Sequence, residues 1–151
     1  MSKQVQEGTG SKYIKAEIDN VIVGYSEWIP RGEDTMEPLS GPDLTFNMRY
    51  VGQVIRTRRR VTEGKRYWYL ICLAVDPAYF GGGIGRRLVQ WGIDEAKKDD
   101  SDCYLETMLK NEAFYSKLGF KTIGWESIEA PEAPEGVCEW IYMIREGRKG
   151  G

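Results

Sequence analysis

A long apolar strand, a glycine-rich turn and an amphipathic helix follow one another in the middle of the chain, and this order limits the fold more than any other feature. Trp68–Val75 is a nearly unbroken apolar run of strand length, which is typical of a strand covered on both faces of a sheet. Four glycines then fall within Gly81–Gly85, and apolar residues at helical spacing follow as far as Lys98. Because another short strand is expected at Cys103–Thr107, the segment predicts a βαβ unit with two parallel strands.

Antiparallel strands are expected on both sides of this βαβ unit. Two β-rich runs, Lys12–Asp19 and Val21–Trp28, meet at Asp19-Asn20, a pair that tolerates left-handed backbone conformations and therefore predicts a hairpin. Phe120–Ile128 and Val137–Ile144 are expected to form the last two strands. The sequence thus predicts an α/β fold of the α+β kind, with a mixed, mostly antiparallel, twisted sheet, a central parallel βαβ unit and helices on both faces.

The segment between the first hairpin and the apolar strand is expected to hold a loop and a helix. Ile29–Pro42 is rich in proline, glycine and acidic residues, which indicates a long surface loop. Asp43 is a candidate N-cap, and apolar residues recur after it at spacings that place them on one helix face: Leu44, Met48, Val51 and Ile55. The arginines at 56 and 58–60 complement the negative end of the helix dipole, so we interpret them as structural and assign them no chemistry.

Composition restricts both the number of domains and the chemistry. A chain of 151 residues, 41% of them hydrophobic, suits a single domain over residues 1–151, with solvated tails expected at 1–10 and 147–151. The absence of histidine excludes a Ser-His-Asp or Cys-His nucleophile pair and any histidine-containing zinc site. A net charge of -2 argues against a nucleic-acid partner. No apolar stretch reaches the roughly 20 residues that span a bilayer, so no membrane association is expected.

The cysteines indicate a reducing environment. Cys72, Cys103 and Cys138 are odd in number, widely spaced and without a C-x-x-C pair, so they favour neither a disulfide framework nor a thiolate metal cluster. We interpret all three as small core residues. The expected location is therefore the cytoplasm.

The glycine turn is a candidate anion site. Gly81–Gly85 comes directly before a helix, so its N–H groups can converge on one point where the helix dipole adds positive potential. It is not a Walker loop, because no G-K-[ST] follows, and a dinucleotide-binding pattern would require glycine at Arg86. On this segment alone, the alternative that the glycines merely permit a tight turn stays open.

The segment around the glycine turn and two segments after it together resemble a known family. The run from Leu73 to Leu88, LAVDPAYFGGGIGRRL, resembles motif A of the GCN5-related N-acetyltransferases (GNAT), which bind acetyl-CoA. Tyr104-Leu105-Glu106 is similar to the family's next strand, and Ala113–Phe120, AFYSKLGF, to its following short helix and strand. The resemblance implies the acyl-CoA N-acyltransferase fold, acetyl-CoA as co-substrate without a metal, and direct transfer of an acetyl group to a primary amine.

The resemblance also implies which residues contact acetyl-CoA. The main chain from Gly81 to Arg86 would surround the pyrophosphate, and backbone groups of the preceding strand would pair with the pantetheine arm. The implied contacts are Leu73, Ala74, Val75, Gly81, Gly82, Gly83, Ile84, Gly85, Arg86 and Asn111. Phe80 departs from the family pattern, because glutamine or arginine is usual at that position.

Two proton transfers are needed for the reaction. A lysine-like amine has a pKa near 10.4 and must lose a proton before it attacks, and the resemblance assigns Glu106 as the general base. Glu27 and a chain of waters are alternatives for that role. The departing thiolate would be protonated by Tyr115, which aligns with the family's general acid and lies in an expected short helix over Asn111–Leu118 that ends at Gly119.

The acceptor side is less defined by the sequence. Family members usually carry a strand and one or two helices before the hairpin, and here these are expected to be missing. Either Asp43–Arg60 and a partner subunit complete the wall, which implies a possible homodimer, or the chain is a non-catalytic acyl-CoA-binding module of the same fold. Acidic residues at 33, 34, 37, 129, 132 and 135 could attract a cationic amine, and both a small molecule and a peptide are open as acceptor.

Overall fold

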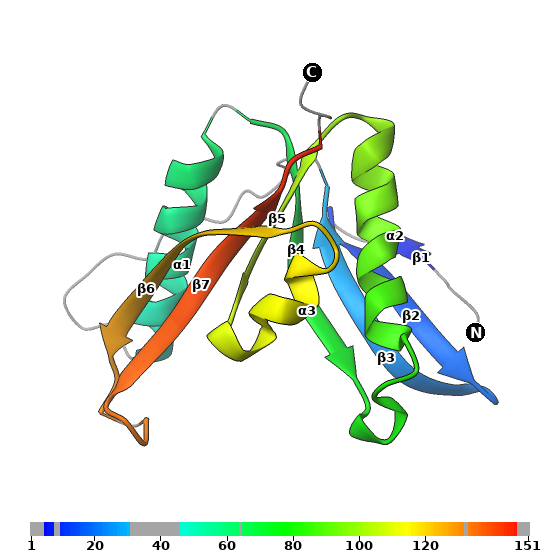
Figure 1. Cartoon of the computed structure of the whole chain (residues 1–151), viewed down its shortest axis with the longest axis horizontal. Helices are drawn as coiled ribbons and strands as arrows, with labels where there is room; N and C mark the ends of the chain where they lie inside the picture. The colour runs from blue at the N-terminus through cyan, green and yellow to red at the C-terminus, as the bar shows by residue number, and fades with distance from the viewer. Residues whose placement is uncertain (1–4, 8–9, 31–45, 64, 132, 148–151) are drawn as a thin grey trace.

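A seven-stranded mixed sheet carries the fold (Figure 1). The computed structural model describes residues 5–7, 10–30, 46–63, 65–131 and 133–147. Of the loop expected at Ile29–Pro42, Ile29 is instead the last residue of a strand, and the part from 31 on lies outside the described residues, as do the expected N-cap Asp43 and Leu44. The strand order is β1-β2-β3-β4-β5-β7-β6. The strands are β1 (Val5–Glu7), β2 (Lys12–Ile18), β3 (Val21–Ile29), β4 (Tyr67–Val75), β5 (Asp102–Thr107), β6 (Lys121–Glu129) and β7 (Val137–Arg145).

The predicted topology is confirmed, with one strand added. β4 and β5 are parallel, and every other neighbouring pair is antiparallel. Asp19 and Asn20 have φ values of 51° and 65° at the turn of the β2–β3 hairpin, as their tolerance of left-handed backbone predicts. Within the range 1–10, where we expect a solvated tail, the described residues include a short strand, β1, in which Val5 pairs with Ile14.

Helix α2 (Ile84–Lys98) covers one face of the sheet (Figure 1). Its apolar side packs on Trp28, which is 0% exposed, and on the buried residues of β2–β5 and β7. Gly92 makes this close packing possible, since a Cβ at that position would lie 2.1 Å from the indole of Trp28. The sheet therefore holds the N-terminus of α2, with its glycine turn, in a fixed place.

Helix α1 (Phe46–Thr62) covers the opposite face, over a cluster of buried tyrosines from β4, β5 and β7: Tyr67, Tyr69, Tyr104 and Tyr142. The predicted apolar face is only partly correct. Ile55 is buried as expected, but Val51 is 36% exposed and Val54 is buried in its place. The sheet contact thus lies on a stripe rotated from the one that the spacing predicts.

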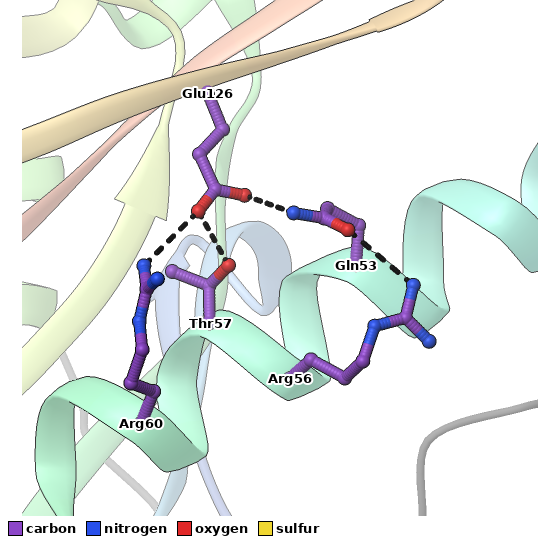
Figure 2. Close-up of polar contacts among 5 residues, drawn as sticks. All are labelled: Gln53, Arg56, Thr57, Arg60 and Glu126. Atoms are coloured by element: carbon purple, nitrogen blue, oxygen red, sulfur yellow. Dashed lines mark hydrogen bonds and ion pairs between the residues drawn. The ribbon is translucent and has the colours of Figure 1, made fainter.

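A polar network fastens α1 to the edge strand β6. Glu126 accepts hydrogen bonds from Thr57 Oγ1 at 2.6 Å and from Gln53 Nε2 at 2.8 Å, and Arg60 Nη2 lies 3.4 Å from the same carboxylate. Arg56 in turn donates to Gln53 at 3.3 Å. Figure 2 shows these contacts along one side of the helix. These contacts hold the helix beside β6, so Arg56 and Arg60 have a structural role, as we expect.

The cysteines differ from the prediction in part. Cys103 is buried, and burial raises the pKa of its thiol to about 12. Cys72 and Cys138 are only partly buried, because each lies on a strand position that faces away from the α2 core. The interpretation of all three as core residues is therefore wrong for these two.

Candidate functional site

The parallel strands β4 and β5 separate after a short stretch of pairing. Only Tyr67, Trp68 and Tyr69 have partners in β5, the last pair being Tyr69 and Tyr104. Beyond it the two strands diverge, as Figure 1 shows, while β4 keeps its pairing with β3 as far as Val75. One edge of β4 therefore faces the gap with main-chain groups that β5 does not use.

A bulge in β4 lies at the same place. Glu27 pairs with Cys72 and the next residue, Trp28, pairs with Leu70, so Ile71 has no partner in this register. The extra residue of a bulge is left unpaired and redirects the strand. The main-chain groups of Ile71 thus lie where β4 and β5 separate, a feature that the sequence alone does not reveal.

A cavity of about 620 Å³ opens at this separation. The glycine turn, the free part of β4 and the short helical segment after β5 line it together. Ten of the residues assigned from the sequence lie on its wall: Leu73, Ala74, Val75, Gly81, Gly83, Ile84, Gly85, Arg86, Asn111 and Tyr115. Gly82 belongs to the turn without lining the cavity, and Glu106 does not line it.

The glycine turn presents main-chain donors to this cavity. Gly81 and Gly83 have φ values of 85° and 81°, which favour glycine because a Cβ destabilises left-handed backbone. Gly83 is the N-cap of α2 and no side chain caps it. The first helical bond runs from Arg87 N to Gly83 O at 3.1 Å, so the N–H groups of residues 84–86 have no acceptor within the helix.

A positive side chain accompanies these donors. A Cβ added at Gly83 would lie 3.7 Å from Nη2 of Arg86, which puts the guanidinium beside the turn. Exposed N–H groups, the positive end of a 15-residue helix and an arginine are the combination that binds phosphate groups. The residues present therefore fit a diphosphate.

Tyr115 reaches the cavity from α3 (Glu112–Ser116). This helix comes directly after a short 3-10 turn, η2 (Leu109–Asn111); an earlier 3-10 turn, η1 (Pro77–Tyr79), precedes the glycine turn. Its side chain is 7% exposed and packs edge-on against Phe114 and Phe120, with ring centroids 4.9 and 5.8 Å away. Gly119, at φ 94°, turns the chain so that Phe120 returns to this position. Burial raises the pKa of Tyr115 to about 12, so the phenol holds its proton at neutral pH.

Asn111 also lies at the cavity wall. Its Nδ2 donates to Thr107 Oγ1 at 3.0 Å, which ties the segment after β5 to the strand end. The helix expected over 111–118 is shorter in the structure: Asn111 ends the turn η2, and α3 has five residues. The short helix still brings Asn111 and Tyr115 to one cavity.

Glu106 lies on the other side of the sheet, under α1. Its Oε1 accepts a hydrogen bond from the Tyr69 hydroxyl at 2.5 Å, and its Oε2 lies 3.9 Å from Arg58 Nη1. The interpretation of Arg58 as a residue that only complements the helix dipole is incomplete, since this side chain is 1% exposed and lies beside Glu106. A signal existed in the sequence: Arg58 is three residues after Ile55 and therefore on the buried stripe.

A family model decides the identity. The acetyltransferase (GNAT) family model matches residues 3–120, which includes the glycine turn and Tyr115. The chain belongs to the acetyltransferase (GNAT) family.

Two solved structures share the GNAT fold with this chain. The ribosomal-protein-S18-alanine N-acetyltransferase from Escherichia coli is 18% identical with a TM-score of 0.62, over 96% of this chain and 74% of that one. The protein smu.2055 from Streptococcus mutans UA159 is 20% identical with a TM-score of 0.61, over 93% and 72%.

A curated relative matches a shorter segment. The "Probable acyltransferase SID5" of Ajellomyces capsulatus is 29% identical over 62 residues, which are 41% of this chain and 46% of that protein. The chain thus matches less than half of that relative's length. Within the described ranges, no helix is long and apolar enough to cross a membrane, and no three His, Cys, Asp or Glu side chains gather as a metal site.

Two further residues from the sequence analysis are Phe80 and Glu27. Phe80, which departs from the pattern that the resemblance implies, is 69% exposed at the cavity wall. Glu27 pairs across the strands with Tyr13 on one side and Cys72 on the other. A hydrogen bond to Glu27 raises the pKa of Tyr13, and Cys72 is close enough to Tyr115 to contribute to the raised pKa of that phenol. Glu27 thus lies on the strand next to Cys72 and does not line the cavity.

Proposed function

We propose that this chain is an N-acetyltransferase that moves an acetyl group from acetyl-CoA to a primary amine by direct attack in a ternary complex. The observation that carries the proposal is the single cavity that joins the uncapped glycine turn, the free edge of β4 and the Tyr115 phenol. These are an anion site, a strand-pairing edge and a proton donor, arranged around one space. The proposal treats residues 1–151 as one N-acetyltransferase domain.

Acetyl-CoA has parts that match these three features. Its diphosphate suits the main chain of Gly81–Arg86, and its amide-containing pantetheine arm can pair with the main chain of Leu73–Val75 as an added strand would. The thioester would then lie near the bulge at Ile71, where unpaired main-chain groups can polarise the carbonyl. Asn111 can donate to the arm from the opposite wall.

The chemical step needs no covalent intermediate on the protein. The amine nitrogen attacks the thioester carbonyl carbon, the C–N bond forms and the C–S bond breaks, and holding both reactants in one site removes most of the entropic cost. The amine gives one proton to a base. The departing CoA thiolate takes the Tyr115 proton, and solvent later restores it.

Two carboxylates can serve as the base from the face of the sheet opposite α2. Glu106 is close to the point where β4 and β5 separate, but it does not line the cavity, so a water would carry the proton to it. Glu27 lies on the neighbouring strand, opposite Cys72. We retain Glu106 as the assigned base and Glu27 as the alternative, to be compared as Glu106→Gln and Glu27→Gln.

The acceptor is proposed as a primary amine on a small molecule or a peptide. The alanine N-acetyltransferase from Escherichia coli named above shares the fold, which makes a protein α-amine one member of the panel to be tested. Helix α1 supplies part of the acceptor wall in this proposal, and a second copy of the chain could supply more. Free cysteines are consistent with a reducing cytoplasm.

A non-catalytic acyl-CoA-binding module is the second candidate, and Phe80 favours it, because a phenyl ring cannot replace the polar contact usual at that position. Calorimetry with acetyl-CoA, followed by CoA thiol release with a panel of amines, separates the two. Binding with release identifies the transferase, and binding without release for every amine identifies the module. Absence of acetyl-CoA binding would overturn both.

Arginine 86 provides a direct test of the phosphate site. We expect Arg86→Glu to weaken acetyl-CoA binding about tenfold or more, because it replaces attraction to the diphosphate by repulsion. Arg87→Glu is the matched control, since Arg87 is the next residue, is exposed and does not line the cavity. Calorimetry at two salt concentrations measures the effect, which should shrink at high salt. Equal losses in both variants would contradict the assignment of Gly81–Arg86.

A further inference from the structure

A buried arginine beside Glu106 is not used by the mechanism described so far. Arg58 comes from α1 and is 1% exposed, within the tyrosine cluster between α1 and the sheet. Removing a guanidinium from water costs several kcal/mol unless its charge is compensated. Side chains that stay buried at such a cost are held by specific partners, and those partners indicate what the arginine does.

The partners of Arg58 form a chain that ends at the point where β4 and β5 separate. Its guanidinium carbon lies 4.1 Å from the centroid of the Tyr69 ring, a cation–π contact, and its Nη1 lies 3.9 Å from Glu106 Oε2. Tyr69 in turn donates its hydroxyl to Glu106 Oε1 at 2.5 Å. The two carboxylate oxygens are thus held from two directions, one by a charge and one by a phenol.

The position of this group relates it to the reaction. Tyr69 is the last residue of β4 that pairs with β5, and Glu106 is two residues beyond its partner Tyr104. The bulge residue Ile71 lies two residues further along β4. Arg58 therefore contacts a carboxylate next to the point where β4 and β5 separate, on the face of the sheet under α1.

We propose that Arg58 is a positioning residue that keeps the Glu106 carboxylate ionised and oriented toward the opening between β4 and β5, so that α1 is part of the catalytic apparatus. The inference rests on the proposed function and adds to it a residue from an element that the family motifs do not include. A base has to be ionised before it can accept the amine proton. A positive charge nearby favours that ionised form.

The other groups around Glu106 make its ionisation sensitive to Arg58. The titratable side chains that face it in the described part of the chain are phenols: Tyr50 from α1, Tyr69 from β4, Tyr104 from β5 and Tyr142 from β7. Burial raises the pKa of Tyr104 and Tyr50, with Glu106 contributing in the same direction, so both are neutral.

Two other titratable groups lie on the same face of the sheet. Cys138 lies near Tyr50, and the Glu126 carboxylate is already bound by Thr57, Gln53 and Arg60.

Three variants test the inference through the pH dependence of kcat/KM. In Arg58→Met, the acid limb is expected to move to higher pH by about one to three units, the usual range for loss of a close opposite charge. Arg58→Lys keeps the charge and should return the limb most of the way to its native position. Arg56→Met removes an exposed arginine of the same helix and should leave the limb unchanged.

The outcomes separate this inference from the proposed function. Acetyl transfer by the native chain with an unmoved acid limb in Arg58→Met would overturn the role of Arg58 alone. Absence of transfer to any amine would overturn the proposed function and the catalytic role of Arg58 with it, even if the pair stabilises the fold.

A second measurement does not depend on activity and covers poor folding of Arg58→Met. Denaturant unfolding of Arg58→Met, Glu106→Gln and the double variant forms a double-mutant cycle. We expect the double variant to lose less stability than the sum of the single losses, because removing one partner strands the other in a buried site. Additive losses would show that the two side chains are not coupled and would overturn the inference.

Discussion

Replacing the Tyr115 hydroxyl by hydrogen is expected to lower kcat for acetyl transfer about 100-fold, the lower end of the usual contribution of a general acid. The phenol lines the cavity and is almost fully buried, so in Tyr115→Phe no water of matching position replaces the lost donor. The aromatic packing on Phe114 and Phe120 is retained by the phenyl ring. Acetyl-CoA affinity should therefore change little, and calorimetry together with thiol release measures both quantities.

Tyr67→Phe is the matched control for this variant. Tyr67 is also a buried tyrosine, but it lies in the cluster under α1 and outside the cavity. Its kcat should stay near the native value. A native kcat in Tyr115→Phe would contradict the acid role. Loss of binding, turnover and stability together would instead identify Tyr115 as a packing residue.

The pH dependence gives a second test of the Tyr115 role. Burial raises the pKa of this phenol from its usual 10.0 to about 12. Below pH 10 the folded and unfolded chains both keep the proton, so the phenol gives no pH-dependent change in stability. Between pH 10 and 12 only the unfolded chain loses it, and stability falls as pH rises. Ionisation of Tyr115 should likewise leave kcat unaffected below about pH 10, so a basic limb at lower pH would have to come from another group.

The parts of the site with local sequence signals are predictable. The glycine turn and α2 can be predicted because their residues are contiguous in the sequence. The structure confirms both, with α2 starting at Ile84 and ending at Lys98. The same holds for the glycines at 81 and 83 and for Gly119 at the end of the short helix. Each has a positive φ, a backbone conformation that favours glycine. Tyr115 is located by the short motif around it.

The parts that depend on contacts between distant segments are not predictable in this way. The spacing of Arg58 from Ile55 places it on the buried side of its helix, but its contacts with Glu106 and Tyr69 follow only from the docking of α1 on β4 and β5. The bulge at Ile71 depends on the register with β3. The three residues of β1 are too few for a recognisable period. In the proposed function, α1 supplies part of the acceptor wall, so the sequence says least about the acceptor.

The glycine turn is held in place by the packing of α2 on the sheet, and Gly92→Ala should strongly disturb the close contact with Trp28 within that packing. A Cβ on Gly92 would lie 2.1 to 2.4 Å from three atoms of the Trp28 indole, so either the indole or α2 has to move. Trp28 is completely buried, so any movement of the indole has to displace its core neighbours. We expect a loss of about 3 kcal/mol in the free energy of unfolding, in the upper part of the range for overpacked cores, or about 6–12 °C in Tm.

The sign of this effect distinguishes packing from helix propensity. In an exposed helix interior, glycine to alanine stabilises by about 0.5–1 kcal/mol, so a stabilised Gly92→Ala would show that α2 does not contact Trp28. Adding Trp28→Phe removes part of the clashing ring, and the double variant should lose less stability than the sum of the single losses. Because the N-terminus of α2 carries the glycine turn, displacement of the helix should weaken acetyl-CoA binding in Gly92→Ala even where the chain remains folded. Recovery of binding in the double variant would connect the packing of one glycine in the core to the geometry of the phosphate site.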